Sequence, residues 1–111
     1  MFRRKALALA TLSTIVCSGA AVADDGFKSS KFLTYAADSQ KSYINTSVLM
    51  ATLIAAQNSK DQATCIGNWS GQYVSDGYQP VIEAMRKFPD HPPTGVILAV
   101  LQKACGSFAY R

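Results

Sequence analysis

The sequence predicts an all-α fold, a compact small bundle of about four main helices stapled by one disulfide. Three observations lead to this prediction. Apolar side chains recur at helical spacing in several successive windows. No window alternates polar and apolar residues over a bounded, β-branched run, as a half-buried strand would. Two cysteines, Cys65 and Cys105, lie in the part of the chain that we expect to remain after a signal peptide is removed.

The first 23 residues are expected to be a signal peptide, cleaved after Ala23. Basic residues 3–5 precede an apolar run, residues 6–16, that is too short to span a bilayer. Residues 21–23, Ala-Val-Ala, then give the small-x-small pattern that signal peptidase requires. We therefore expect a periplasmic mature chain, residues 24–111, that forms a single helical domain with no stable membrane insertion.

Two alternatives to this processing stay open. An uncleaved membrane anchor is disfavoured because the apolar run is short and a good cleavage site follows it. Lipidation of Cys17 is disfavoured because Val16 stands where a lipidation signal needs a small residue.

The charge of the chain depends on this processing. The whole sequence has a formal net charge of +4, but three of its 11 basic residues lie in the leader. The mature chain keeps eight basic residues against seven acidic ones. No basic cluster remains that could neutralise a line of phosphates, so we expect no nucleic-acid binding.

The mature chain begins with a polar lead-in, residues 24–30, and a short helical segment, residues 31–37. Asp38 and Ser39 are of the type that caps helices, and a long helix is predicted over residues 40–57. Its buried face is expected to hold two neighbouring lines: Ile44, Val48, Ala51 and Ala55, and then Tyr43, Ser47, Met50 and Ile54. The predicted solvent-facing residues are Lys41, Asn45 and Thr52.

A second main helix is predicted over residues 62–73, with Asp61 as its cap. Gly67 and Gly71 each weaken a helix interior by about 1 kcal/mol relative to alanine, so we expect this helix to be short or to fray near Gly71. The residues that share one face are Cys65, Ile66 and Trp69.

The third and fourth helices are separated by a proline-rich link, residues 89–93. Pro80 suits the first turn of the third helix. The fourth follows Thr94, its predicted N-cap, and is expected to be buried on most sides. The apolar stripes are Val81, Ile82, Met85 and Phe88 in the third helix, and Ile97, Leu101, Cys105 and Phe108 in the fourth.

Cys65 and Cys105 form an even pair in an exported chain, which predicts a disulfide. Closing a loop of about 40 residues would stabilise a small domain by roughly 4 kcal/mol in the chain-entropy model. A redox-active pair would more often stand in a close C-x-x-C arrangement, so we expect a structural role.

The residues needed for catalysis or metal binding are few. His91 is the single histidine, so one chain cannot build a histidine-based metal site. It is expected in a solvated loop, although a pH-responsive role stays open because its free pKa is near 6.5. The carboxylates are scattered at expected helix starts and turns, and the serines lack a nucleophile elbow. We therefore expect no enzyme, no cofactor and no metal.

Residues 67–78 are the stretch most open to a functional interpretation. Trp69, Tyr73 and Tyr78 alternate there with small polar residues, as in many partner-binding surfaces. The alternative is that these aromatics fill the core. Trp69 is the better candidate for the core, and Tyr78, which follows a Ser-Asp-Gly break, is the better candidate for a surface anchor.

Short motifs carry a resemblance over residues 65–105. A cysteine opens a helix in Cys65-Ile66-Gly67-Asn68-Trp69, a later helix ends in Phe88-Pro89-Asp90-His91-Pro92, and Ala104-Cys105 closes the last helix. The chain thereby resembles the small periplasmic immunity proteins of type VI secretion, in the Tai and Rap group. That resemblance implies a partner-binding protein that neutralises a peptidoglycan amidase. The chain is also similar to the periplasmic acid-stress chaperones, which are small, helical and stapled by one disulfide.

Two functions follow as hypotheses. The first is a periplasmic protein-binding module of the immunity or inhibitor kind, which neutralises a secreted cell-wall hydrolase through residues 67–78 and nearby helix ends. The second is an acid-stress protein or chaperone that exposes apolar surface when the bundle loosens at low pH.

Overall fold

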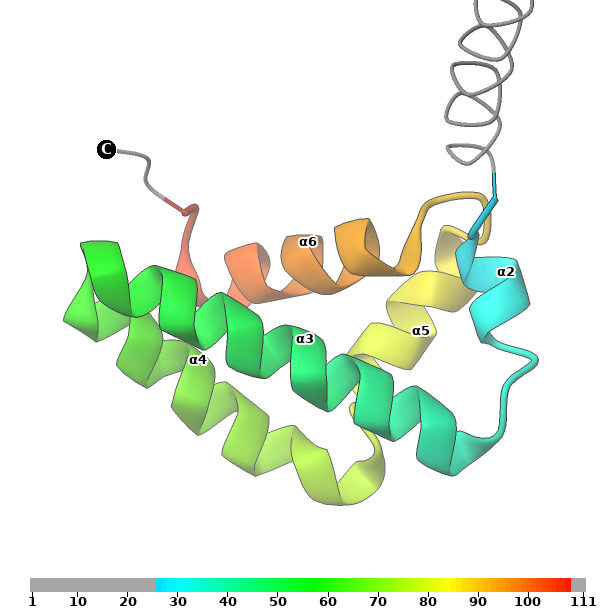
Figure 1. The fold of residues 1–111 in the computed structure, drawn as a ribbon, viewed down its shortest axis with the longest axis horizontal. Helices are drawn as coiled ribbons and strands as arrows, with labels where there is room; N and C mark the ends of the chain where they lie inside the picture. Colours follow the sequence, from blue (N-terminus) through cyan, green and yellow to red (C-terminus); the bar gives the residue numbers. More distant parts are fainter. Residues whose placement is uncertain (1–25, 109–111) are drawn as a thin grey trace, which may run out of the picture.

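The structure, a computed structural model, describes residues 26–108, and within them the chain is all-α (Figure 1). In chain order the elements are α2 (Ser29–Phe32), α3 (Ala37–Asn58), α4 (Lys60–Tyr73), the 3₁₀ turn η2 (Val74–Asp76), α5 (Gln79–Lys87) and α6 (Pro93–Cys105). No strand occurs in this part of the chain. The predicted bundle of four main helices with a short N-terminal one is confirmed. The predicted signal peptide and Cys17 lie outside the described residues.

The bundle is organised around α3, which has 22 residues. Figure 1 shows α4 folding back along one side of α3, with α6 along another side and α5 crossing behind. α5 packs on α6, and α2 contacts both of them near the link that joins them. The buried apolar core comprises Phe32, Ile44, Val48, Ala51, Ala55, Ile66, Tyr78, Val81, Ile82, Met85, Val96, Ile97 and Leu101.

Two helix caps differ from those predicted. The cap of α4 is Ser59, whose hydroxyl oxygen accepts a hydrogen bond of 3.2 Å from the Gln62 backbone N–H; Asp61 lies inside the first turn. A serine hydroxyl at this position satisfies one of the free N–H groups at a helix start. α6 begins at Pro93, so Thr94 also lies inside its helix. Proline fits the first helical position because the N–H that it lacks would be unpaired there.

The first two main helices are longer than predicted. α3 begins at Ala37, which places Asp38 and Ser39 in its first turn. α4 passes through Gly67 and Gly71 and ends at Tyr73 without fraying, because η2 continues the chain directly. A Cβ at either glycine would meet nothing within 4 Å, so neither serves a close approach between helices.

α2 is held by the link between α5 and α6. The backbone N–H and the hydroxyl of Ser29 both donate to the His91 carbonyl oxygen, at 2.8 and 2.7 Å, and the Ser30 N–H donates to the Pro89 carbonyl oxygen at 2.9 Å. Ser29 is fully buried. A helix of four residues is not stable alone, so these bonds and the burial of Phe32 fix α2 to the bundle.

The apolar stripes are only partly buried, which corrects three expectations. The first predicted line of α3 is in the core, but Met50 and Ile54 of the second line are more than half exposed. Phe88, expected in the buried stripe of the third helix, is 51% exposed. α6 was expected to be buried on most sides, but it is buried on one side only, since Leu98 is 39% exposed. α3 and α6 carry more apolar side chains than the neighbouring helices can cover.

Candidate partner-binding surfaces

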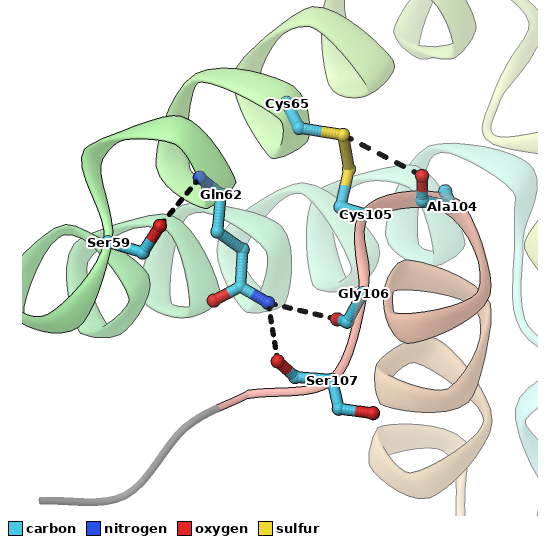
Figure 2. The surroundings of a disulfide bond; sticks show 7 residues. All are labelled: Ser59, Gln62, Cys65, Ala104, Cys105, Gly106 and Ser107. Carbon is cyan, nitrogen blue, oxygen red and sulfur yellow. Dashed lines mark hydrogen bonds between the residues drawn. A yellow bond between two sulfur atoms is a disulfide. The ribbon is translucent and has the colours of Figure 1, made fainter.

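The predicted disulfide joins α4 to the end of α6 (Figure 2). The two sulfur atoms of Cys65 and Cys105 are 2.02 Å apart and the Cα atoms 5.7 Å apart, across 40 residues of sequence. The Cα separation is in the ordinary range for a disulfide. With both sulfurs in this bond, neither cysteine offers a thiol for chemistry.

Gln62 fixes the chain just beyond the disulfide. Its side-chain N–H₂ group donates to the carbonyl oxygens of Gly106, at 2.9 Å, and Ser107, at 3.1 Å (Figure 2). Gly106 has φ of +90°, a conformation that favours glycine. The two bonds hold the chain after α6, so that Phe108 lies against the core. The sequence reasoning missed Gln62, because a polar residue at a helix start looks solvent-facing.

Tyr78 is part of the core, and the prediction that it lies on the surface is wrong. Its side chain is fully buried, and its hydroxyl donates a hydrogen bond of 2.7 Å to the Asn45 side-chain oxygen. The Ser70 hydroxyl lies 2.8 Å from the Tyr78 hydroxyl oxygen. Because the tyrosine proton is given to Asn45, Ser70 is the donor in that second bond. A partner could not contact Tyr78 without opening the bundle.

The backbone of Tyr78 explains why its side chain turns inward. Tyr78 is the N-cap residue of α5 and has φ of 61°, the left-handed conformation that costs a non-glycine residue roughly 1–2 kcal/mol. Gly77 just before it is also left-handed, with φ of 75°. This double turn reverses the chain at the end of η2 and directs the tyrosine ring between α3 and α4.

Trp69 and Tyr73 flank Tyr78 at the edge of the core. The Trp69 ring stacks on Tyr78, with ring centroids 5.7 Å apart, and meets Tyr73 at 5.3 Å. Both side chains are partly buried. The three aromatics of residues 67–78 are therefore brought together, but as one packed stack rather than as a row of surface anchors.

A first uncovered surface is an apolar groove between α3 and α6, the α3–α6 groove, of about 600 Å³. None of its lining residues within the described range, residues 26–108, is charged. Beside it on α3, Leu49 and Leu53 are 58% and 67% exposed. The lining residues are Thr46, Ser47, Met50, Ala51, Ile54, Asn58, Thr94, Ile97, Leu98, Leu101 and Phe108.

A second groove, the α5–α6 groove, has a volume of about 550 Å³ and a different character. Its lining includes Lys87 of α5, Lys103 of α6 and His91 of the link, and Glu83 is its one carboxylate among residues 26–108. Within residues 26–108 neither lysine forms an ion pair. The apolar lining residues are Pro80, Ala84, Phe88, Gly95, Val96, Ala99 and Val100.

The side chains able to do chemistry are spread out. Among residues 26–108, no three His, Cys, Asp or Glu side chains form a group that could hold a metal ion. His91 is exposed in the link, with its ring 5.4 Å from that of Phe88. No helix in the described part of the chain has the length and apolar character to cross a membrane.

An aromatic cluster joins the start of α3 to α2 and the residues around it. Tyr43 meets Phe32 at a centroid distance of 5.0 Å and Phe27 at 6.1 Å. Burial raises the pKa of the Tyr43 hydroxyl above its ordinary value of 10.0, and the nearby Tyr35 adds to this. Tyr43 therefore stays neutral at physiological pH and contributes as an aromatic side chain.

Comparison with protein-family models, with characterised proteins and with solved structures finds no match for this chain.

Proposed function

We propose that the mature chain is a small exported protein-binding module of the immunity or inhibitor kind, which acts in the periplasm. The observation that carries this proposal is the α5–α6 groove, where apolar side chains lie between two lysines that form no ion pair with any described residue. Non-obligate interfaces, which form between proteins that are also stable alone, combine an apolar centre with a polar rim in this way. The motifs at Cys65 and Cys105 support a cell-wall hydrolase as the partner.

The charges of the groove indicate what such a partner presents. Lys87 and Lys103 come from different helices, and Glu83 is the one opposing charge among the described lining residues. A partner loop or helix end with an apolar side chain flanked by carboxylates is complementary to this arrangement. Opposite charges at the rim speed association and fix orientation more than they add affinity. The apolar contact with Phe88, Val96 and Val100 would supply most of the binding energy.

Charge reversal tests the proposal. Lys103→Glu should weaken binding to a periplasmic partner recovered with the mature chain by about tenfold or more, and mainly by slowing association. Phe88→Ser should weaken it through the loss of apolar contact. Lys60→Glu is the matched control, since Lys60 is equally exposed but lies at the start of α4, outside the groove. Equal binding by all three variants and the wild type would exclude this groove.

The alternative, an acid-stress chaperone, is favoured by the exposed apolar side chains of α3 but lacks an acid trigger in the described residues. Within residues 26–108 no carboxylate forms an ion pair. Asp76 is the one carboxylate in that range with a described hydrogen bond, 3.2 Å from the Gln79 N–H. Protonating these groups would therefore break few native contacts. Acid-induced dye binding with retained helicity would favour the chaperone over the binding module.

A further inference from the structure

We infer that a second copy of this chain covers the exposed face of α3, so that the protein is a symmetric dimer. This face, called here the α3 face, consists of Leu49, Met50, Leu53 and Ile54 together with Leu98 across the α3–α6 groove. These five side chains are 39–67% exposed. The inference goes beyond the proposed function, because the α5–α6 groove uses another side of α6: Val96, Ala99 and Val100 rather than Ile97, Leu98 and Leu101.

The α3 face has a shape that fits a copy of itself. Met50 and Ile54 line the groove, whereas Leu49 and Leu53, each one position earlier, stand outside the lining. One position rotates a side chain by about 100° around a helix, so the leucines form a ridge beside the groove. A two-fold axis parallel to α3, lying in the plane between the two copies, places the ridge of each copy in the groove of the other. A two-fold interface needs this self-complementarity, since one patch must serve as both partners.

The charges are also compatible with self-association. No Asp, Glu, Lys or Arg occurs between Ser42 and Ser59, and none lines the groove in the described part of the chain. The nearest charges lie beyond the two ends of this stretch, and each end carries one acid and one base. They are Asp38 and Lys41 before it, and Lys60 and Asp61 after it. The two α3 helices then run parallel and like ends lie together, and neither end has an excess of one sign that would repel its copy.

The size of the face suits a stable dimer. The uncharged stretch of α3 is about 25 Å long and, with α6 beside it, about 20 Å wide, which gives a projected area of roughly 500 Å². Accessible area exceeds projected area on a ridged surface, so the face approaches the roughly 800 Å² per partner of a standard interface. Homodimer interfaces are also the more apolar kind, which matches the α3 face, whereas the charged α5–α6 groove matches the non-obligate kind.

The test is the mass in solution of the mature protein across a dilution series, by analytical ultracentrifugation. The wild type should sediment as a dimer that dissociates on dilution. Leu53→Glu should raise the dissociation constant at least about 100-fold, because a symmetric interface receives the substitution twice. Leu53 is 67% exposed, so the variant should keep its helical circular dichroism as a folded monomer. Leu49→Lys is the second variant, with a charge of the opposite sign.

Phe88→Glu is the matched control, since Phe88 is 51% exposed but lies in the other groove. It should remain a dimer but lose binding to the periplasmic partner. If the two surfaces act separately, Leu53→Glu should become a monomer and still bind that partner. A wild type that stays monomeric at the highest soluble concentration would overturn the inference. So would a dimer that survives both Leu53→Glu and Leu49→Lys. Binding of the monomer to neutral phospholipid vesicles, lost in Leu53→Glu, would assign the face to a membrane surface instead.

Discussion

The Tyr78 hydroxyl donates a 2.7 Å hydrogen bond to the side-chain oxygen of Asn45, across 33 residues of sequence. This bond joins the start of α5 to the middle of α3. With Ser70 as the second partner of the hydroxyl, three elements meet at one buried polar point. Buried polar groups that are fully paired specify how helices fit together, and they become costly when one partner is removed.

Tyr78→Phe should therefore destabilise the fold by about 1–3 kcal/mol, the cost of leaving the partly buried Asn45 acceptor without its donor. Tyr78→Ala should cost more, about 3–5 kcal/mol, because a cavity replaces the ring under Trp69. Tyr73→Phe is the control: Tyr73 is only partly buried, and its hydroxyl has one long contact, 3.4 Å from Gln72. This substitution should change the free energy of unfolding, measured by urea denaturation, by no more than about 0.5 kcal/mol. Equal free energies of unfolding for Tyr78→Phe and the wild type would mean that the hydrogen bond from Tyr78 to Asn45 does not stabilise the fold.

Loss of the disulfide should destabilise the fold by roughly 2–5 kcal/mol in either Cys65→Ala or Cys105→Ala, the usual cost of removing a native disulfide from a small domain. The bond anchors the end of α6, and α6 supplies three core residues: Val96, Ile97 and Leu101. Thiol labelling of the folded wild type without reductant should find no free cysteine. Stoichiometric labelling of both cysteines would show that the bond does not form in the native protein.

The sequence alone predicted the helices and the disulfide, because both depend on local or simple signals. Ile44, Val48, Ala51 and Ala55 are spaced for one helix face, and an even number of cysteines in an exported chain predicts a bond. The helix caps were less predictable. Ser59 and Asp61 are both good caps, and only the direction in which the chain enters α4 decides between them.

The surfaces could not be predicted in the same way. Spacing places Met50 and Ile54 on a wide apolar side of α3, but it does not show how many neighbours are present to cover that side. The burial of Tyr78 depends on a left-handed backbone and on Asn45, which is distant in sequence. The run of residues 48–56 in α3 is apolar except for Thr52, and in a chain this short it was the available signal that some apolar surface would stay uncovered.

Processing can be checked by intact mass. The Ala-Val-Ala sequence at residues 21–23 predicts cleavage after Ala23, so protein purified from the periplasm should begin at Asp24. Ala23→Leu should slow or stop cleavage, because signal peptidase needs a small residue there. A lipid adduct on Cys17, or a full-length chain in the membrane fraction, would contradict the proposed export as a free protein.

Alkaline pH should destabilise the fold in part through Tyr43. Its pKa is raised above the ordinary 10.0 in the folded protein by burial, so the folded state holds this proton more tightly than the unfolded state does. The contribution is fully present below pH 10.0 and is lost as pH rises through the folded pKa. Tyr43→Phe should therefore lose less stability than the wild type above that pH. Melting temperatures of the pair across an alkaline pH series measure the difference, and parallel curves would contradict it.

Gln62→Glu should destabilise the fold, and by more at neutral than at acidic pH. The native amide donates both of its protons to the Gly106 and Ser107 carbonyl oxygens. A carboxylate cannot donate, and it would stand against two acceptors in a buried site, at a cost of about 1–3 kcal/mol or more. Burial and these carbonyls should raise the folded pKa of the introduced carboxyl, so stability should return as pH falls and a proton is regained.

Gln72→Glu, on the exposed side of α4, is the control and should show no such recovery. Denaturation of both variants at neutral and acidic pH makes the comparison, and equal losses at the two pH values would mean that the Gln62 amide does not hold the chain after α6.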